Sequence, residues 1–64
     1  MINMVRVYES EMRDFQRILE ADQAMLELEK SPEKRTALHK EIEEMENKIV
    51  WARRKMEFAR RPSP

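Results

Sequence analysis

The sequence predicts an all-α protein, an antiparallel two-helix hairpin of the coiled-coil type that dimerises into a four-helix bundle. Three observations predict this fold. The chain has no glycine and is rich in Glu, Lys and Arg, a composition typical of long helices. Apolar residues recur at alternating steps of three and four in each half of the chain, which is the spacing of a coiled-coil seam. A single Ser31-Pro32 step separates the two halves.

The first helix is expected over about residues 3–30. Its seam is formed by Val5, Tyr8, Met12, Phe15, Leu19, Asp22 and Leu26. Only Asp22 interrupts the apolar pattern, and a buried carboxylate without a partner is costly. Asp22 therefore either pairs with His39, Lys40 or an arginine of a second chain, or fixes register and oligomeric state, or lines a functional pocket.

A turn is expected at about residues 30–32. Leu26 and Leu38 are 12 residues apart and so belong to different heptad phases, which ends a continuous seam. Pro32 in mid-helix would cost about 3 kcal/mol, whereas it is well placed as the first residue of a new helix with Ser31 as the N-cap. Because no glycine is available to end the first helix, the turn is expected to close through a 3₁₀ turn or through Ser31.

The second helix is expected over about residues 32–60, followed by a frayed tail at 62–64. Its seam is formed by Leu38, Ile42, Met45, Ile49, Ala52, Met56 and Ala59. Folding at the turn pairs residues whose numbers sum to roughly 64, so Leu19 should meet Met45 and Phe15 should meet Ile49. The first helix is acidic and the second basic, and this register brings the acidic pair Glu9 and Glu11 near the basic pair Arg53 and Lys55.

The hairpin is expected to need a second chain. A single core in 64 residues rarely supplies more than about 3 to 5 kcal/mol, and the absence of cysteine excludes disulfides as a staple. Two apolar patches lie off the seam, and they predict the interface with another copy or with a partner protein: Ile18, Ala21, Met25 and Leu28 on the first helix, and Val50, Trp51 and Phe58 on the second. In a two-fold dimer of antiparallel hairpins these patches would face each other.

No catalytic residue, cofactor site or metal site is predicted. His39 and Glu43 lie one turn apart, but no further ligand completes a metal pattern. The carboxylates around Glu41 alternate with lysines, as on a solvated face. An enzyme site between subunits around Asp22 and His39 is the least favoured reading. The chain has no apolar run long enough to cross a membrane and no signal peptide, so a cytoplasmic location is expected.

Two functions remain open after these exclusions. The leading prediction is a non-enzymatic helical protein-protein interaction module or small regulator that acts as a homo-oligomeric bundle. The alternative is a small nucleic-acid-binding regulator that uses the basic end of the second helix. That end contains Arg53, Arg54, Lys55, Arg60 and Arg61. The 13 basic and 13 acidic residues of the whole chain balance, so no global positive field supports this alternative.

Overall fold

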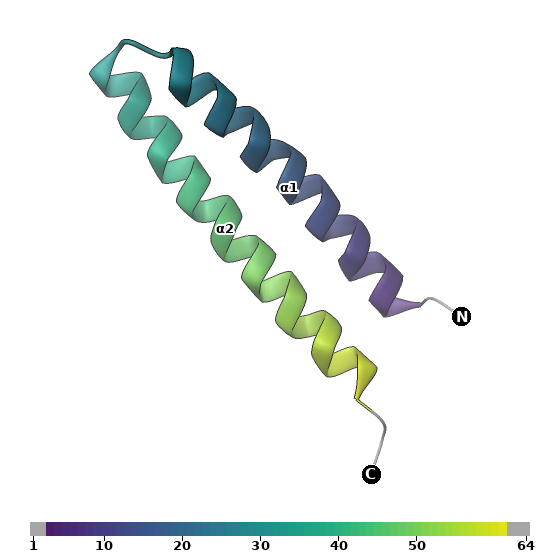
Figure 1. Ribbon diagram of the computed structural model, residues 1–64. Helices are drawn as coiled ribbons and strands as arrows, with labels where there is room; N and C mark the ends of the chain where they lie inside the picture. The colour runs from purple at the N-terminus through teal and green to yellow at the C-terminus, as the bar shows by residue number, and fades with distance from the viewer. Residues whose placement is uncertain (1–2, 62–64) are drawn as a thin grey trace.

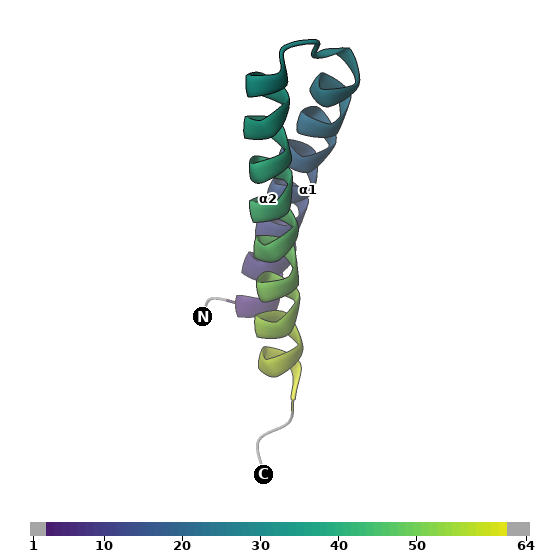
Figure 2. The same cartoon turned by 90° about the vertical axis from the view of Figure 1, so that its left-hand side faces the viewer.

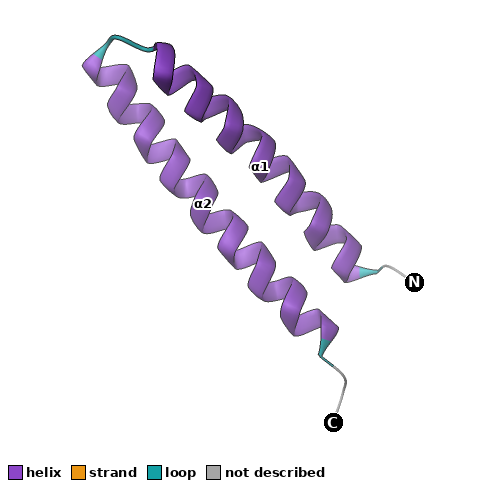
Figure 3. Ribbon diagram, in the orientation of Figure 1, coloured by secondary structure: helices purple, strands orange, loops and turns teal. Residues whose placement is uncertain are grey.

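The computed structural model describes residues 3–61, which form an antiparallel helical hairpin (Figures 1 and 3). Helix α1 spans Met4–Leu28 and helix α2 spans Pro32–Arg60, with no strand among the described residues. The all-α fold with two packed helices is therefore confirmed. The first helix ends two residues earlier than expected, which moves the turn to residues 29–31. The tail predicted at 62–64 lies outside the described residues.

Side-chain caps explain where both helices begin. Asn3 Oδ1 accepts a hydrogen bond from the Val5 amide at 3.1 Å, which satisfies one of the donors that the first turn leaves without a partner. Ser31 Oγ accepts from the Lys34 amide at 3.5 Å, and Pro32 follows as the first helical residue. The predicted N-cap role of Ser31 is confirmed.

The turn closes without glycine because Arg35 caps the end of α1 from the other helix. Both Glu29 and Ser31 have extended backbone conformations, and no described residue has a positive φ. Arg35 Nη1 donates to the carbonyl oxygens of Leu26 at 2.8 Å and Glu29 at 3.0 Å. These carbonyls lack partners within the helix, and a guanidinium at the negative end of α1 also complements the helix dipole.

The seam forms the apolar contact between the two helices, and its centre is the best buried part. Leu19, Met45 and Ile49 make one buried cluster, against which Met12, Phe15 and Ile42 pack. This grouping agrees with the predicted register, which sets Leu19 against Met45 and Phe15 against Ile49. Figures 1 and 2 agree that the helices run along each other as a single layer from the turn to the opposite end. Neither α1 nor α2 contains an apolar stretch of the length that a membrane span requires.

One predicted ion-pair partner is different in the structure. Glu9 Oε1 accepts from Arg60 Nη2 at 3.0 Å, and this is the single salt bridge within residues 3–61. The predicted register instead sets Glu9 near Lys55 and Arg53. Arg60 takes their place because its long side chain reaches along the flank of the hairpin from the last turn of α2. Both side chains remain about half exposed, so this pair contributes little to stability.

Candidate interaction surface

Helix α1 carries a second stripe of residues beside the seam. The stripe follows the same spacing of three and four and consists of Met4, Val7, Glu11, Asp14, Ile18, Ala21, Met25 and Leu28. Every member except Leu28 directly precedes a seam residue. Because consecutive residues of an α-helix are about 100° apart around its axis, the stripe is rotated from the seam by about 100°. Its large apolar side chains are exposed, with Met25 at 55% and Leu28 at 82%. Glu11 and Asp14 are its only polar members.

Helix α2 places a second stripe on the same side of the hairpin, in which charged residues lie between the apolar ones: Ala37, Glu41, Glu44, Lys48, Trp51, Lys55 and Phe58. Ala37, Trp51 and Phe58 again each precede a seam residue, and Trp51 and Phe58 are 60% and 75% exposed. Since α2 runs antiparallel to α1, the same rotation brings both stripes to one side. We call this side the apolar face. It comprises Met4, Val7, Ile18, Ala21, Met25 and Leu28 of α1, and Ala37, Trp51 and Phe58 of α2.

Two shallow grooves between the helices confirm that the stripes are neighbours. The groove near the turn is lined by Met25, Glu29, Lys34, Ala37, Leu38 and Glu41. The groove near the termini is lined by Met4, Tyr8, Trp51, Arg54, Lys55, Phe58 and Ala59. Apart from Val50, the two patches predicted from the sequence therefore lie on one side of the hairpin, one toward each end, with the charged residues Glu11, Asp14, Glu44 and Lys48 between them.

The face differs from the predicted interface at both ends. Met4 and Val7 were missed, although their spacing from Ile18 continues the same stripe. Val50 is 43% exposed but lines neither groove. It lies one residue before Trp51 and therefore about 100° away around the helix, toward the other side of the hairpin. Val50 is therefore not part of the apolar face, and its predicted role in an interface stays a prediction.

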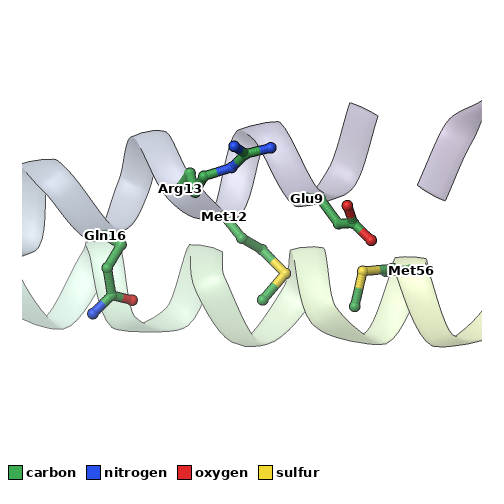
Figure 4. Close-up of a pocket in the computed structure, with 5 residues that line it drawn as sticks. All are labelled: Glu9, Met12, Arg13, Gln16 and Met56. Carbon is green, nitrogen blue, oxygen red and sulfur yellow. The ribbon is translucent and has the colours of Figure 1, made fainter. Parts of the chain in front are cut away.

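The opposite side of the hairpin is more polar. Its groove is lined by Glu9, Met12, Arg13, Gln16 and Met56 (Figure 4). Met12 and Met56 extend toward each other from the two helices, whereas the Arg13 side chain points away from α2. The groove thus has a small apolar floor between charged and amide groups, which gives it no continuous apolar stripe.

Asp22 is buried in the seam with only 6% of its surface exposed. Its Oδ2 atom has no hydrogen-bond partner, and the pairing expected with His39 or Lys40 is absent from the hydrogen bonds and ion pairs of the described residues. The group that does approach Asp22 is another carboxyl, that of Glu41. A protonated Glu41 can hydrogen-bond Asp22, while an ionised Glu41 is repelled by it. Both effects raise the pKa of Glu41 above its ordinary value, with smaller contributions from desolvation and from Glu44.

The predicted nucleic-acid contacts are exposed, but they do not form one patch. All five basic residues named above lie on the last three turns of α2 or directly after it, pointing in several directions around the helix. Arg54 lies over the Trp51 ring at 5.5 Å from its centroid, and Arg60 pairs with Glu9. Two of the five cations are thus already engaged within the hairpin.

Neither metal binding nor a relationship to a known family adds to this description. Within residues 3–61 no three His, Cys, Asp or Glu side chains are grouped so that they could hold a metal ion. The chain matches no protein-family model, no curated protein and no solved structure. The apolar face and the charges around it are therefore the features that bear on function.

Proposed function

We propose that this protein is a non-enzymatic helical interaction module. In this proposal two hairpins pack through their apolar faces into a homodimeric four-helix bundle in the cytoplasm, and the assembled bundle binds a regulatory or structural protein partner. The observation that carries the proposal is the second stripe of α1, which keeps its large apolar side chains exposed to water in the isolated hairpin.

The position of the second stripe supports a four-helix bundle over an isolated hairpin. In a square arrangement of four helices each helix touches two neighbours, so it needs two contact stripes about 90° apart. The seam and the second stripe are about 100° apart. The seam contacts the other helix of the same chain, which leaves the second stripe for another chain.

The size of the face also suits a specific interface. Helices of 25 and 29 residues at 1.5 Å per residue give a face about 40 Å long, and two adjacent helices make it about 20 Å wide. Such a face covers about 800 Å² per chain, which is the usual area of a stable protein-protein interface.

Self-association is tested by light scattering during size-exclusion chromatography over a dilution series, with helicity followed by circular dichroism. The expected result is a dimer that dissociates on dilution and then loses part of its helix, because the isolated hairpin is only marginally stable. Met25→Glu should shift the equilibrium to monomer, because it places a charge in the apolar face. Ala24→Glu is the matched control, since Ala24 is also exposed but lies outside the face. A chain that stays monomeric at millimolar concentration refutes the dimer.

A small nucleic-acid-binding regulator is the second candidate. The end of α2 supports it, because Trp51 stacks with Arg54 beside further cations. Fluorescence anisotropy with labelled single-stranded RNA and duplex DNA tests this candidate at low and high salt. Binding that weakens steeply with salt and disappears in the triple variant Arg53→Ala, Arg54→Ala, Lys55→Ala would favour it. No binding at low salt excludes it.

A further inference from the structure

The two ends of the hairpin carry opposite net charge. This difference is not evident along the sequence, because each end combines a segment of α1 with a segment of α2. The midpoints of the two helices are Gln16 and Glu46, and they divide the described residues into a turn half, residues 17–46, and a terminal half, residues 3–16 and 47–61. The turn half has nine acidic and five basic side chains, for a net charge of −4. The terminal half has four acidic and eight basic side chains, for a net charge of +4.

This polarity selects one of the two ways in which the apolar faces can pack. If both turns point the same way, like-charged halves lie over each other. If one hairpin is reversed end for end, each half lies over the oppositely charged half of the other copy. Complementary charge fixes orientation in this way even where it adds little affinity. Reversal also sets each helix antiparallel to its own copy, with Leu28 opposite Met4 and Met25 opposite Val7.

The carboxyl pair in the turn half makes no ion pair among the described residues. Asp22 is more than nine-tenths buried, and its Oδ2 atom makes no hydrogen bond among the described residues. Glu41 lies beside it, in the groove that belongs to the apolar face. Lys48 lowers the pKa of Glu41, which opposes the upward shift. Its ammonium group lies over the Phe15 ring of its own chain, 5.7 Å from the centroid. Lys34 lines the same groove but forms no ion pair with either carboxylate, so the exposed Glu41 remains open to a cation of a second copy.

In the reversed dimer the second copy offers a suitable lysine. In this arrangement α2 of one copy runs antiparallel to α2 of the other, and their midpoints at Glu46 coincide. Glu41, five residues before the midpoint, therefore lies opposite Trp51 of the second copy, five residues after it. Lys55 is one turn from Trp51 on the same stripe and lines the groove near the termini. We propose that two copies pack end for end and that Lys55 of the second copy pairs with Glu41 next to Asp22, so that each chain completes the acidic site of the other. This inference rests on the proposed self-association through the apolar face.

A charge exchange across the interface tests the pairing. In a Glu41→Lys homodimer a lysine meets Lys55, and in a Lys55→Glu homodimer a glutamate meets Glu41, so both self-associate more weakly. In a mixed dimer both contacts join opposite charges. We expect each variant alone to dissociate at a concentration about tenfold higher than the wild type, and the equimolar mixture to return to within about threefold of it.

Net charge alone also favours mixing, so the matched control is a second exchange on the other side of the hairpin. Glu46→Lys and Arg53→Glu change the net charge by the same amounts, and both residues are exposed and outside the apolar face. This pair should dimerise like the wild type, alone or mixed. Helicity is measured for every variant at a concentration where it is dimeric, so that a folding defect is recognised.

The outcomes separate this inference from the function on which it rests. A wild-type chain that is monomeric throughout refutes both. A wild-type dimer whose Glu41→Lys and Lys55→Glu variants are unaffected, or whose mixture recovers no better than the control pair, refutes the end-for-end pairing alone. As a second readout, chains carrying only Val7→Cys and only Met25→Cys should oxidise to a mixed disulfide, since the natural sequence has no cysteine. Preferential formation of Met25→Cys homodimers contradicts the reversal.

Discussion

Replacing Asp22 by leucine should stabilise the hairpin, because Asp22 Oδ2 is buried in the seam without a hydrogen bond. Removing a buried polar group that lacks its hydrogen bond recovers about 1 to 3 kcal/mol. Burying a leucine side chain adds about 1.5 to 3 kcal/mol, whereas fitting its extra volume into the packed seam costs about 1 to 3 kcal/mol. The net gain is about 2 to 3 kcal/mol, which corresponds to roughly 10 to 20 °C in the melting temperature of so small a domain.

The assay is thermal unfolding followed by circular dichroism at one fixed chain concentration, because the melting temperature of an oligomer depends on it. Glu20→Leu is the control, since it also replaces a carboxylate on α1 by leucine but at an exposed position. It should change stability by less than about 0.5 kcal/mol. If Asp22→Leu lowers the melting temperature, Asp22 has a stabilising partner and the reasoning is wrong. If Asp22→Leu is more stable but gives several oligomers, Asp22 sets the oligomeric state.

Three further predictions concern capping, pH and the surface ion pair. Arg35→Met should lower the free energy of unfolding by about 1.5 to 3 kcal/mol, because two carbonyl groups lose a charged donor, and amide hydrogen exchange should show fraying at the end of α1. Since the pKa of Glu41 is raised in the folded hairpin, the folded state binds a proton more readily than the unfolded state, and stability should fall as the pH rises from the ordinary pKa through the raised one. Urea titrations under monomeric conditions across that range should show this dependence in the wild type and its loss in Glu41→Gln; an identical dependence in both chains contradicts the assignment. Glu9→Gln breaks the ion pair with Arg60 and should change the free energy of unfolding, measured by urea titration, by less than about 1 kcal/mol. A larger loss would mean that the pair is more than a surface contact.

The sequence was sufficient for the fold because the relevant signals are local and periodic. Seam spacing, the break in heptad phase and the Ser31-Pro32 start each depend on a few neighbouring residues, and the structure has the helices and the N-cap that they predict. The cap that Arg35 provides was not predictable in the same way. It depends on how the turn orients one helix against the end of the other, which no spacing within a single helix encodes.

The candidate surface was predicted only in part, for a similar reason. Each patch could be found on its own helix, but the joining of both into one face depends on the rotation of each helix about the seam. Met4 and Val7 could have been found by asking which residues precede seam positions. The approach of Glu41 to Asp22 could not have been found by composition, because opposite charge predicts lysine or histidine as the partner.

The position of the charges answers a problem that the apolar stripes leave open. Two helices joined by regular apolar spacing can slip by one heptad, about 10 Å, and still bury similar side chains. Within the chain the short turn prevents such slippage, but between two chains nothing covalent does. In the proposed dimer a slip of one heptad would move Lys55 of the second copy two turns along α2, away from Glu41, and would leave the carboxyl pair at Asp22 without its cation. Asp22 would then destabilise the isolated hairpin but set the register of the two chains in the assembly. We therefore expect the double variant Asp22→Leu, Glu41→Gln to form a bundle that is more stable than the wild type but less uniform in mass and in cross-linking pattern.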